Sequence, residues 1–306
     1  MKTPFAAFNP TLPRTACLLE SSKIFALRVA ASKKDPTPLV RHSEDSPWAG
    51  AEPPFNREAL DTAVDLLLTR LGSPKRISVV LGDPFFTIQV LTLGDFPRSE
   101  AEREKVIFWQ LRKLLDGPGE EFAFSYTKLR NTTAGTTFLV VICRKALVRM
   151  IEESFAKGGC RVGYVAPVSM VLHNLAATGD FMGERGDALL INRAPGYVSF
   201  LFNEEGIPVY FRSKKLPLNE DEEEKAGRIE LAVRLTLAYY KEKLRGPALG
   251  RILIRKWPEG SLLPVDETIV GEARIERIGE LMAELPGGVD RGDDFLPLFA
   301  LMEGKL

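Results

Sequence analysis

Residues 15–29 read TACLLESSKIFALRV, in which two apolar runs, residues 16–19 and 24–27, flank the polar segment Ser21-Ser22-Lys23. Short apolar runs on either side of a polar turn are typical of a β-hairpin. We therefore expect the fold to open with two antiparallel strands.

The same order of strands recurs in the second part of the chain. An apolar strand is expected over residues 188–191, a turn at Pro195-Gly196, a second strand over residues 197–202 and a third over residues 208–211. This recurrence suggests an internal duplication, with a linker over residues 179–186. We expect a first half over residues 1–186 and a second half over residues 187–306.

Helices and strands alternate between and after these hairpins. Asn56 is a good cap for a helix that ends near Gly72, and Ser99 with Glu102 forms a capping box for the next helix. Residues 31–54 are rich in proline and charge and predict a loop with at most a short strand near 39–40. Further strands are expected over residues 77–81, 86–91, 122–129, 137–143, 161–166 and 251–254. Further helices are expected over 145–157, 167–177, 229–244 and 295–302, and the range 275–285 is expected to contain a helix or a partly helical segment. The pattern is that of an α/β protein.

Composition limits the classes of function. The 306 residues carry 41 Lys and Arg against 41 Asp and Glu, and 45% are hydrophobic. A zero net charge is unusual for a general nucleic-acid or anionic-membrane binder, because those surfaces need a basic excess. We expect a cytoplasmic protein without a membrane helix or signal peptide, in which Cys17, Cys143 and Cys160 are reduced core residues.

The sequence offers little for catalysis or metal binding. His42 lies in the proline-rich segment, and His173 lies on an apolar helix, where a hydrogen-bonded structural histidine is expected. No Gly-x-Ser-x-Gly, His-Glu-x-x-His or Cys-x-x-Cys motif is present. We expect neither an enzyme nor a metal or cofactor site.

Residues 93–177 carry a resemblance to a known family. The segments LGDFPRSEAEREKVIFWQLRKLL (93–115), EEFAFSYTKL (120–129) and FLVVICRKALVRMIEESFAKGGCRVGYVAPVSMVLHNLAA (138–177) resemble the subdomain inserted in PilM, the actin-like component of type IV pilus assembly. The cytoplasmic region of the secretion protein GspL is similar more distantly. The resemblance implies an actin-like, ribonuclease H-like α/β fold of duplicated domains, with an inserted α+β subdomain at about 84–165.

Actin-like ATPases hold nucleotide between two Asp-x-Gly hairpins and a later Gly-Gly, since glycine lets backbone amides reach phosphate and the carboxylate positions magnesium. The resemblance places Leu18 at the first Asp, Glu20 at its Gly and Phe25 at a Lys of the first hairpin. We expect the Glu20 carboxylate to repel phosphate. The resemblance therefore implies that the first nucleotide loop has degenerated.

The other two loops depart from the pattern as well. Asn192 and Ala194 stand at the second Asp and Gly, and Arg193 is expected to pair with a surface acid. The Thr-Gly-Gly of the adenosine loop falls on Arg255, Lys256 and Trp257. The segment 211–230 is short, so the helical subdomain that covers the nucleotide in PilM-like proteins is expected to be reduced or missing.

These losses favour a scaffold without ATP hydrolysis, recruited to the cytoplasmic face of the inner membrane. The resemblance implies a PilN-like inner-membrane partner, bound through its N-terminal peptide. A pilus or secretion ATPase is a further candidate partner. Candidate partner-binding residues are Phe108, Trp109, Leu111 and Arg112, although a helical tryptophan is more often a core residue.

Two alternatives stay open. One is a GspL-like adaptor of type II secretion, which would normally continue into a membrane helix, whereas this chain ends at Leu306. The other is an actin-like ATPase that retains nucleotide binding.

Overall fold

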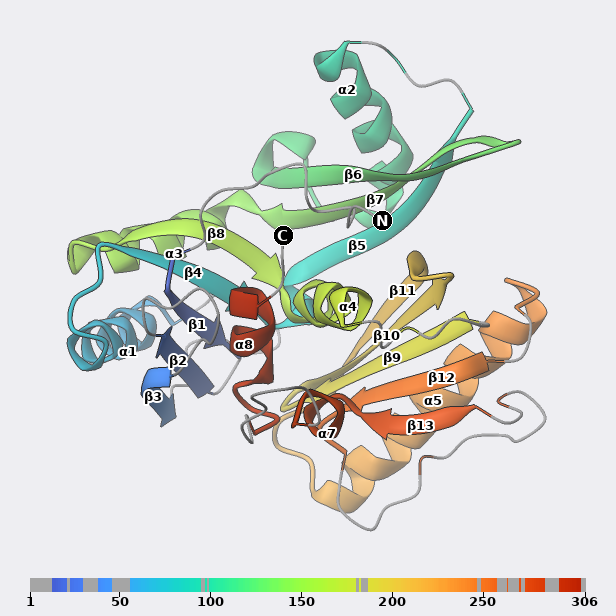
Figure 1. Ribbon diagram of the computed structural model, residues 1–306. Helices are drawn as coiled ribbons and strands as arrows, with labels where there is room; N and C mark the ends of the chain where they lie inside the picture. Colours follow the sequence, from blue (N-terminus) through green and yellow to red (C-terminus); the bar gives the residue numbers. More distant parts are fainter. Residues whose placement is uncertain are drawn as a thin grey trace.

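The computed structural model of the chain describes residues 13–20, 23–29, 38–45, 56–94, 97, 99–179, 182, 187–246, 249–257, 263, 270, 273–283 and 292–303. The strands form two five-stranded sheets and one three-stranded sheet (Figure 1). The α/β class expected from the sequence is confirmed, and so is the opening hairpin.

The first sheet has the order β3-β2-β1-β4-β8. Strands β1, β2 and β3 form an antiparallel meander, while β4 and β8 continue the sheet parallel to β1. The bounds are β1 Thr15–Leu19, β2 Lys23–Val29, β3 Pro38–Asp45, β4 Arg76–Leu81 and β8 Arg161–Pro167.

The second sheet repeats this topology in the order β11-β10-β9-β12-β13. Again three strands form an antiparallel meander, and two parallel strands follow beside the first of them. The bounds are β9 Asp187–Ala194, β10 Tyr197–Glu204, β11 Ile207–Lys215, β12 Leu249–Arg255 and β13 Arg274–Arg277. The matching order supports the duplication expected from the sequence.

Helices cover both faces of the sheets, because successive strand residues point to opposite sides. Cys17 and Leu19 of β1 pack with α1 and α3, whereas Ala16 and Leu18 pack into the core that α4 and α8 form between the two sheets (Figure 1). Helix α5 covers the outer face of the second sheet. The bounds are α1 Arg57–Arg70, α3 Lys145–Lys157, α4 Val168–Thr178, α5 Glu222–Glu242, α7 Ile278–Ala283 and α8 Leu296–Glu303.

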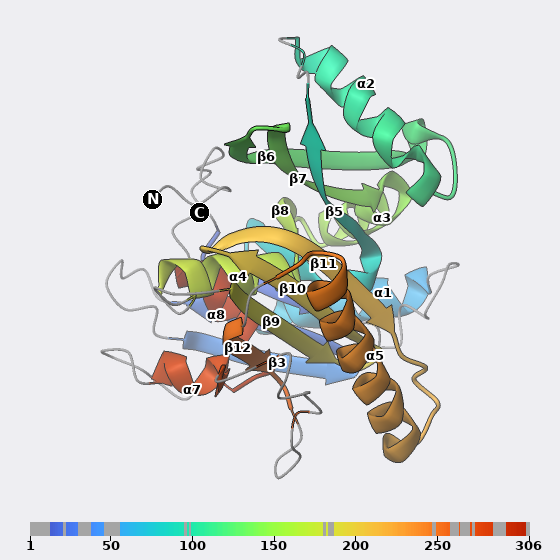
Figure 2. The same cartoon turned by 90° about the vertical axis from the view of Figure 1, so that its right-hand side faces the viewer.

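The three-stranded sheet, in the order β5-β7-β6, projects from the first half together with α2 (Figures 1 and 2). It has a core of its own, which includes Ile107 and Leu111 of α2. The bounds are β5 Phe86–Leu93, α2 Glu100–Leu111, β6 Phe122–Thr132 and β7 Gly135–Arg144. The range 84–165 expected for the insert also contains α3 and most of β8, but β8 pairs with β4 in the first sheet.

Three details refine or leave open the expectations. Strand β3 extends over residues 38–45, so His42 lies in a strand and not in a loop. The helical segment expected within 275–285 is α7, and the strand β13 over residues 274–277, which pairs with β12, comes before it. Most of the expected linker 179–186 lies outside the described residues.

Residues 216–221 alone connect β11 to α5. The connection holds no helix, so the helical subdomain expected to be reduced at this point is missing. Cys17, Cys143 and Cys160 are buried free thiols, as expected. Among the helices that the structure describes, none combines the length and the apolar character that a bilayer span requires.

Candidate functional site

Five polar side chains with almost no exposed surface meet where the strand ends of the two halves face each other. Glu20 lies in the turn between β1 and β2, and Asp83 follows β4. The other three come from the second half: Asn192 of β9, Tyr197 of β10 and Arg255 of β12. All five are at most 1% exposed, and we call them the buried polar cluster.

Arg255 joins the two halves within this cluster. Its Nη2 donates to Oε1 of Glu20 at 3.3 Å, and its Nη1 donates to Oδ1 of Asn192 at 2.9 Å. Its Nε donates to the backbone carbonyl of Asp293 at 2.9 Å. Each guanidinium nitrogen therefore has an acceptor, which a buried arginine requires to offset its lost hydration.

Asp83 extends the cluster to the start of α4. Its two carboxylate oxygens accept hydrogen bonds from the backbone N–H of Ser169 at 2.9 Å and the Ser169 hydroxyl at 2.5 Å. The side-chain amide of Asn192 donates to Asp83 at 2.8 Å. The Ser169 N–H is one that the helix leaves unpaired, so Asp83, which follows β4 and is distant in the sequence, caps α4.

Burial sets the protonation of this region. Desolvation raises the pKa of Asp83, and the hydrogen bonds from Ser169 and Asn192 partly offset that effect. Burial also raises the pKa of Tyr197, and the nearby Asp83 and Glu20 carboxylates add to the rise. The Tyr197 hydroxyl therefore stays neutral near pH 7 and accepts a hydrogen bond from the Asn192 amide at 3.3 Å.

Lys256 closes the cluster on the side of α8. Its Nζ lies 4.0 Å from Oε2 of Glu20, forms an ion pair with Asp294, and lies 5.5 Å from the centroid of the Phe25 ring. Phe25 also packs edge-on against Phe295, with ring centroids 5.5 Å apart. The residues just before α8 thus cover the first hairpin.

The backbone of Lys256 has a φ of 56°, in the left-handed region that glycine adopts most easily. The sequence resemblance places a glycine of the adenosine loop at this residue. The backbone conformation therefore fits the glycine of the pattern, whereas the side chain points into ion pairs with Glu20 and Asp294.

The structure brings some of the predicted loop residues together and separates others. Glu20, Phe25, Asn192 and Lys256 belong to the connected region around Arg255. Leu18 and Ala194 are buried. Trp257 is half-buried against the core of the second half, and its Nε1 has no hydrogen-bond partner among the described residues.

The expectation for Glu20 needs a correction. We expected an uncompensated carboxylate that repels phosphate, but Arg255 and Lys256 balance the charge of Glu20. The sequence comparison missed Asp83, Ser169 and Tyr197. Asp83 alone had a signal in the sequence, because it lies in a Gly-Asp-Pro turn directly after a buried strand.

His173 differs from its expected role as a hydrogen-bonded core histidine. It is completely buried on α4, and neither ring nitrogen has a hydrogen-bond partner among the described residues. Burial lowers its pKa from the ordinary 6.5 to about 4. The imidazole is therefore neutral near pH 7 and has no described acid or base partner for catalysis.

Two of the four predicted contact residues form an exposed surface on the projecting subdomain. Trp109 of α2 is 56% exposed, and the Arg112 guanidinium carbon lies 5.1 Å from the centroid of its indole. Leu114 adds a side chain that is 55% exposed. We call Trp109, Arg112 and Leu114 the α2 surface.

The other two predicted contact residues lie further in. Leu111 is fully buried in the core of the subdomain, so it supports α2 and is not available to a partner. The Phe108 ring packs over Gly119, where an added Cβ would lie 2.3 Å from a ring carbon.

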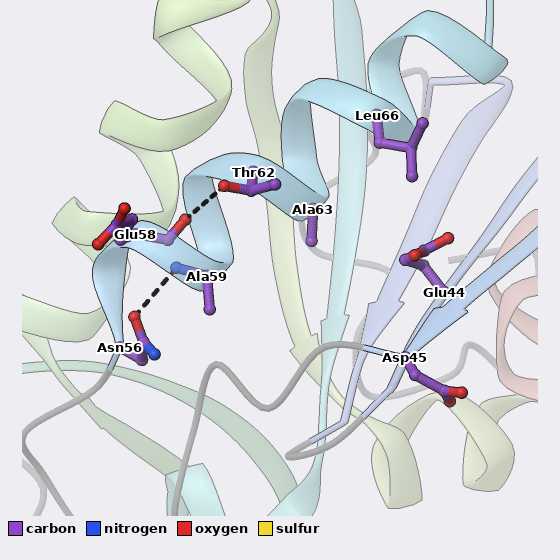
Figure 3. Close-up of a pocket in the computed structure, with 8 residues that line it drawn as sticks. All are labelled: Glu44, Asp45, Asn56, Glu58, Ala59, Thr62, Ala63 and Leu66. Carbon is purple, nitrogen blue, oxygen red and sulfur yellow. Dashed lines mark hydrogen bonds between the residues drawn. The ribbon is translucent and has the colours of Figure 1, made fainter.

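An open hollow of about 350 Å³ lies between β3 and the start of α1 (Figure 3). Three of its lining side chains are acidic: Glu44, Asp45 and Glu58. Glu44 lies 3.6 Å from His42, and Asp45 lies 3.4 Å from Lys23. Carboxylates disfavour an anionic ligand, so this hollow is a poor phosphate site.

Structural comparison decides which fold these elements form. A solved PilM–PilN type IV pilus biogenesis complex contains a chain that superposes with a TM-score of 0.67 at 18% identity, over 96% of this chain and 98% of that one. The chain has the actin-like fold of PilM. The cytoplasmic domain of EpsL, an inner-membrane component of the type II secretion system of Vibrio cholerae, matches with a TM-score of 0.52 at 14% identity, over 88% of this chain and 90% of that one.

A protein of unknown function from Bacteroides thetaiotaomicron with an actin-like ATPase fold matches with a TM-score of 0.57 at 11% identity, over 94% of each chain. No protein-family model matches the chain, and no curated protein matches its sequence. The PilM-like fold thus rests on the structure, and it places the buried polar cluster between the two duplicated halves.

Proposed function

We propose that this PilM-like chain is a cytoplasmic scaffold of a type IV pilus assembly complex, and that it binds a short cytoplasmic segment of a PilN-like inner-membrane partner without hydrolysing ATP. The observation that carries the proposal is the buried Arg255–Glu20 ion pair, because it joins the two halves through the loops where the resemblance places the nucleotide site of actin-like ATPases. Leu18 and Asn192 replace the two aspartates of the pattern, and the carboxylates that do lie there, Glu20 and Asp83, are bound to Arg255, Ser169 and Asn192 of the chain itself.

The solved PilM–PilN complex supports the choice of partner by fold similarity. The α2 surface is the part of the projecting subdomain that suits a peptide contact. An exposed tryptophan stacked with an arginine offers a large apolar area and a cation, and both residue types are enriched where binding energy concentrates.

A peptide titration tests this function. A labelled synthetic peptide with the cytoplasmic N-terminal sequence of the PilN-like protein encoded with this chain is titrated with the purified protein, and fluorescence anisotropy reports binding. We expect saturable binding that Trp109→Ala weakens about tenfold or more, which corresponds to a loss of at least about 1.4 kcal/mol.

Leu218→Ala is the matched control, because Leu218 is 43% exposed but lies on the other half of the molecule. The control variant should bind like the unaltered protein. Absence of peptide binding would overturn the proposed function, whereas binding that Trp109→Ala leaves unchanged would overturn only the place of the contact.

The second candidate is a GspL-like adaptor of a secretion system, which the fold similarity to the EpsL cytoplasmic domain favours. Such an adaptor would bind a secretion ATPase. Co-purification of the chain with each of the two candidate partners, expressed in turn, separates the pilus function from the secretion function.

A further inference from the structure

Basic side chains gather at one edge of the first sheet, where its parallel strands begin. Strands β4 and β8 start there with Arg76 and Arg161, which pair in register. Both strands run toward the second half in Figure 1, so this edge lies on the far side of the first half. Five residues form what we call the basic edge: Arg14, Arg70, Lys75, Arg76 and Arg161.

The backbone of the first half brings these five residues to the same place. The Arg161 N–H donates to the backbone carbonyl of Lys75 at 2.9 Å. Arg14 directly precedes β1, which pairs with β4 on the side opposite β8. Arg70 is the last residue of α1, and a short connection leads from it into β4. The basic edge is therefore one continuous surface, although its residues come from distant parts of the sequence.

The basic edge forms no ion pair within the part of the chain that the structure describes. All five side chains are exposed, and none of them has a hydrogen-bond partner among the described residues. Glu152 lines an open hollow together with Arg161, but the two side chains are not paired. Arg28 of β2 lies beside the edge and donates to the carbonyl of Leu71 at 2.7 Å, so it adds a cation and no acid.

Such an arrangement lowers the stability of the fold. Arg76 and Arg161 lie opposite each other on strands about 5 Å apart, where like charges repel. The neighbouring face of the same half is built differently, since Arg57 of α1 pairs with Glu153 of α3 at 2.7 Å. A row of cations without internal acids fits an anionic surface outside the chain.

We infer that the basic edge binds the phosphate groups of an anionic membrane surface. The inference rests on the proposed function, which brings the chain to the cytoplasmic face of the inner membrane. Charge complementarity supports it, because the cytoplasmic leaflet carries anionic lipids. The cations begin three adjacent strands and span about 10 Å, so they suit several separate headgroups better than one small anion. Residues 1–12, which lead toward Arg14, contain Lys2 and no acidic residue.

The expected contact is local and weak by itself, because the net charge of the chain is zero. Each Lys or Arg near an anionic membrane strengthens binding about fivefold. A membrane partner that holds the chain through a peptide raises the local concentration of the chain at the lipid. The basic edge then orients the scaffold on the membrane without having to recruit it alone.

Flotation of the full chain with vesicles, in the absence of any peptide, tests this contact. We expect binding to phosphatidylcholine vesicles that contain about 30% phosphatidylglycerol and none to pure phosphatidylcholine. Binding should fall as salt rises from about 50 to about 300 mM, because the exposed charges are screened. The double variant Arg76→Gln, Arg161→Gln should weaken binding about tenfold or more.

Lys241→Gln, Lys243→Gln is the matched control. It removes the same two charges from exposed positions at the end of α5, in the second half, and should bind like the unaltered chain. Circular dichroism checks that both double variants are folded. Absence of binding to the anionic vesicles, or equal losses in the two double variants, would overturn the inference.

Two further measurements separate this inference from other readings. Binding to duplex DNA as tight as to the anionic vesicles, at equal phosphate concentration, would overturn the choice of a membrane. The peptide titration of the proposed function, run without lipid, should be the same for the Arg76→Gln, Arg161→Gln variant and the unaltered chain. Failure of vesicle binding with intact peptide binding would therefore overturn the membrane contact alone.

Discussion

Arg255 and Glu20 form an ion pair in which neither side chain has exposed surface. Removing one member of a buried pair leaves the other charge without compensation. We therefore expect Arg255→Met to lower the free energy of unfolding by about 3–5 kcal/mol, measured by urea denaturation.

The double variant Glu20→Gln, Arg255→Met should recover part of this loss, because no charge is then buried alone. Arg57→Met is the control: Arg57 pairs with Glu153 on the surface, where such a pair contributes about 0–1 kcal/mol. Equal losses for Arg255→Met and Arg57→Met would show that the buried pair has no special role.

His173 makes the stability depend on pH. Its pKa is about 4 in the folded protein against an ordinary 6.5, so between these values the unfolded chain binds a proton that the folded chain does not. The folded state thus loses stability as pH falls from about 6.5 to about 4, by a total of roughly 3 kcal/mol for this residue.

We expect His173→Leu to flatten that part of the profile, when urea denaturation is compared for the two proteins at several pH values. Leucine removes the buried imidazole without adding a polar group, so the variant should also remain folded. Parallel pH profiles for the two proteins would contradict the assignment.

The sequence predicts some residues of the site and misses others. The resemblance pointed to Glu20, Asn192 and Lys256, which do lie in one connected region. It did not reveal that Arg255 neutralises Glu20, because the two residues are 235 positions apart and only the fold brings them together. Asp83 escaped notice because an aspartate in a turn is normally exposed.

At the scale of elements, α5 offers a paired glycine test. Gly227 lies on the exposed side of the helix, where an added Cβ meets nothing within 4 Å. Glycine inside a helix is less favourable than alanine, so Gly227→Ala should raise the free energy of unfolding by about 0.5–1 kcal/mol.

Gly246, just after α5, should respond in the opposite direction. An added Cβ there would lie 2.0 Å from the ring of Tyr240. This ring is stacked on Phe202, and its hydroxyl donates a hydrogen bond to Asp187. Gly246→Ala must displace that ring and should lower the free energy of unfolding by about 1–3 kcal/mol. Urea midpoints measured for both variants check the pair, and effects of equal sign would contradict this account of α5.

Elements with a clear apolar pattern were predictable, and those without one were not. Helix α2 begins at the capping box, where the Glu102 N–H donates to the Ser99 hydroxyl. Strand β3 was expected to be at most a short strand near 39–40, because it is an edge strand with the sequence PLVRHSED, in which pairing to β2 and not burial decides the structure. Strand β13 was not predicted for a similar reason, since the four residues RIER do not alternate between buried and exposed positions.

At the scale of the whole molecule, the two halves repeat one topology, and a network of internal ion pairs and hydrogen bonds joins them. The repeat could be predicted because both hairpins have the same order of apolar runs. The buried polar cluster between the halves could not be predicted, since it depends on contacts between long side chains from different strands. The proposed scaffold role rests on this cluster, and nucleotide binding is the property that separates a scaffold from an ATPase.

Isothermal titration of MgATP into the purified chain measures that property directly. We predict no binding heat up to about millimolar nucleotide, which corresponds to a binding free energy weaker than about −4 kcal/mol. Saturable binding at micromolar MgATP would contradict the account, because it would show that the Arg255–Glu20 pair yields its place to a nucleotide.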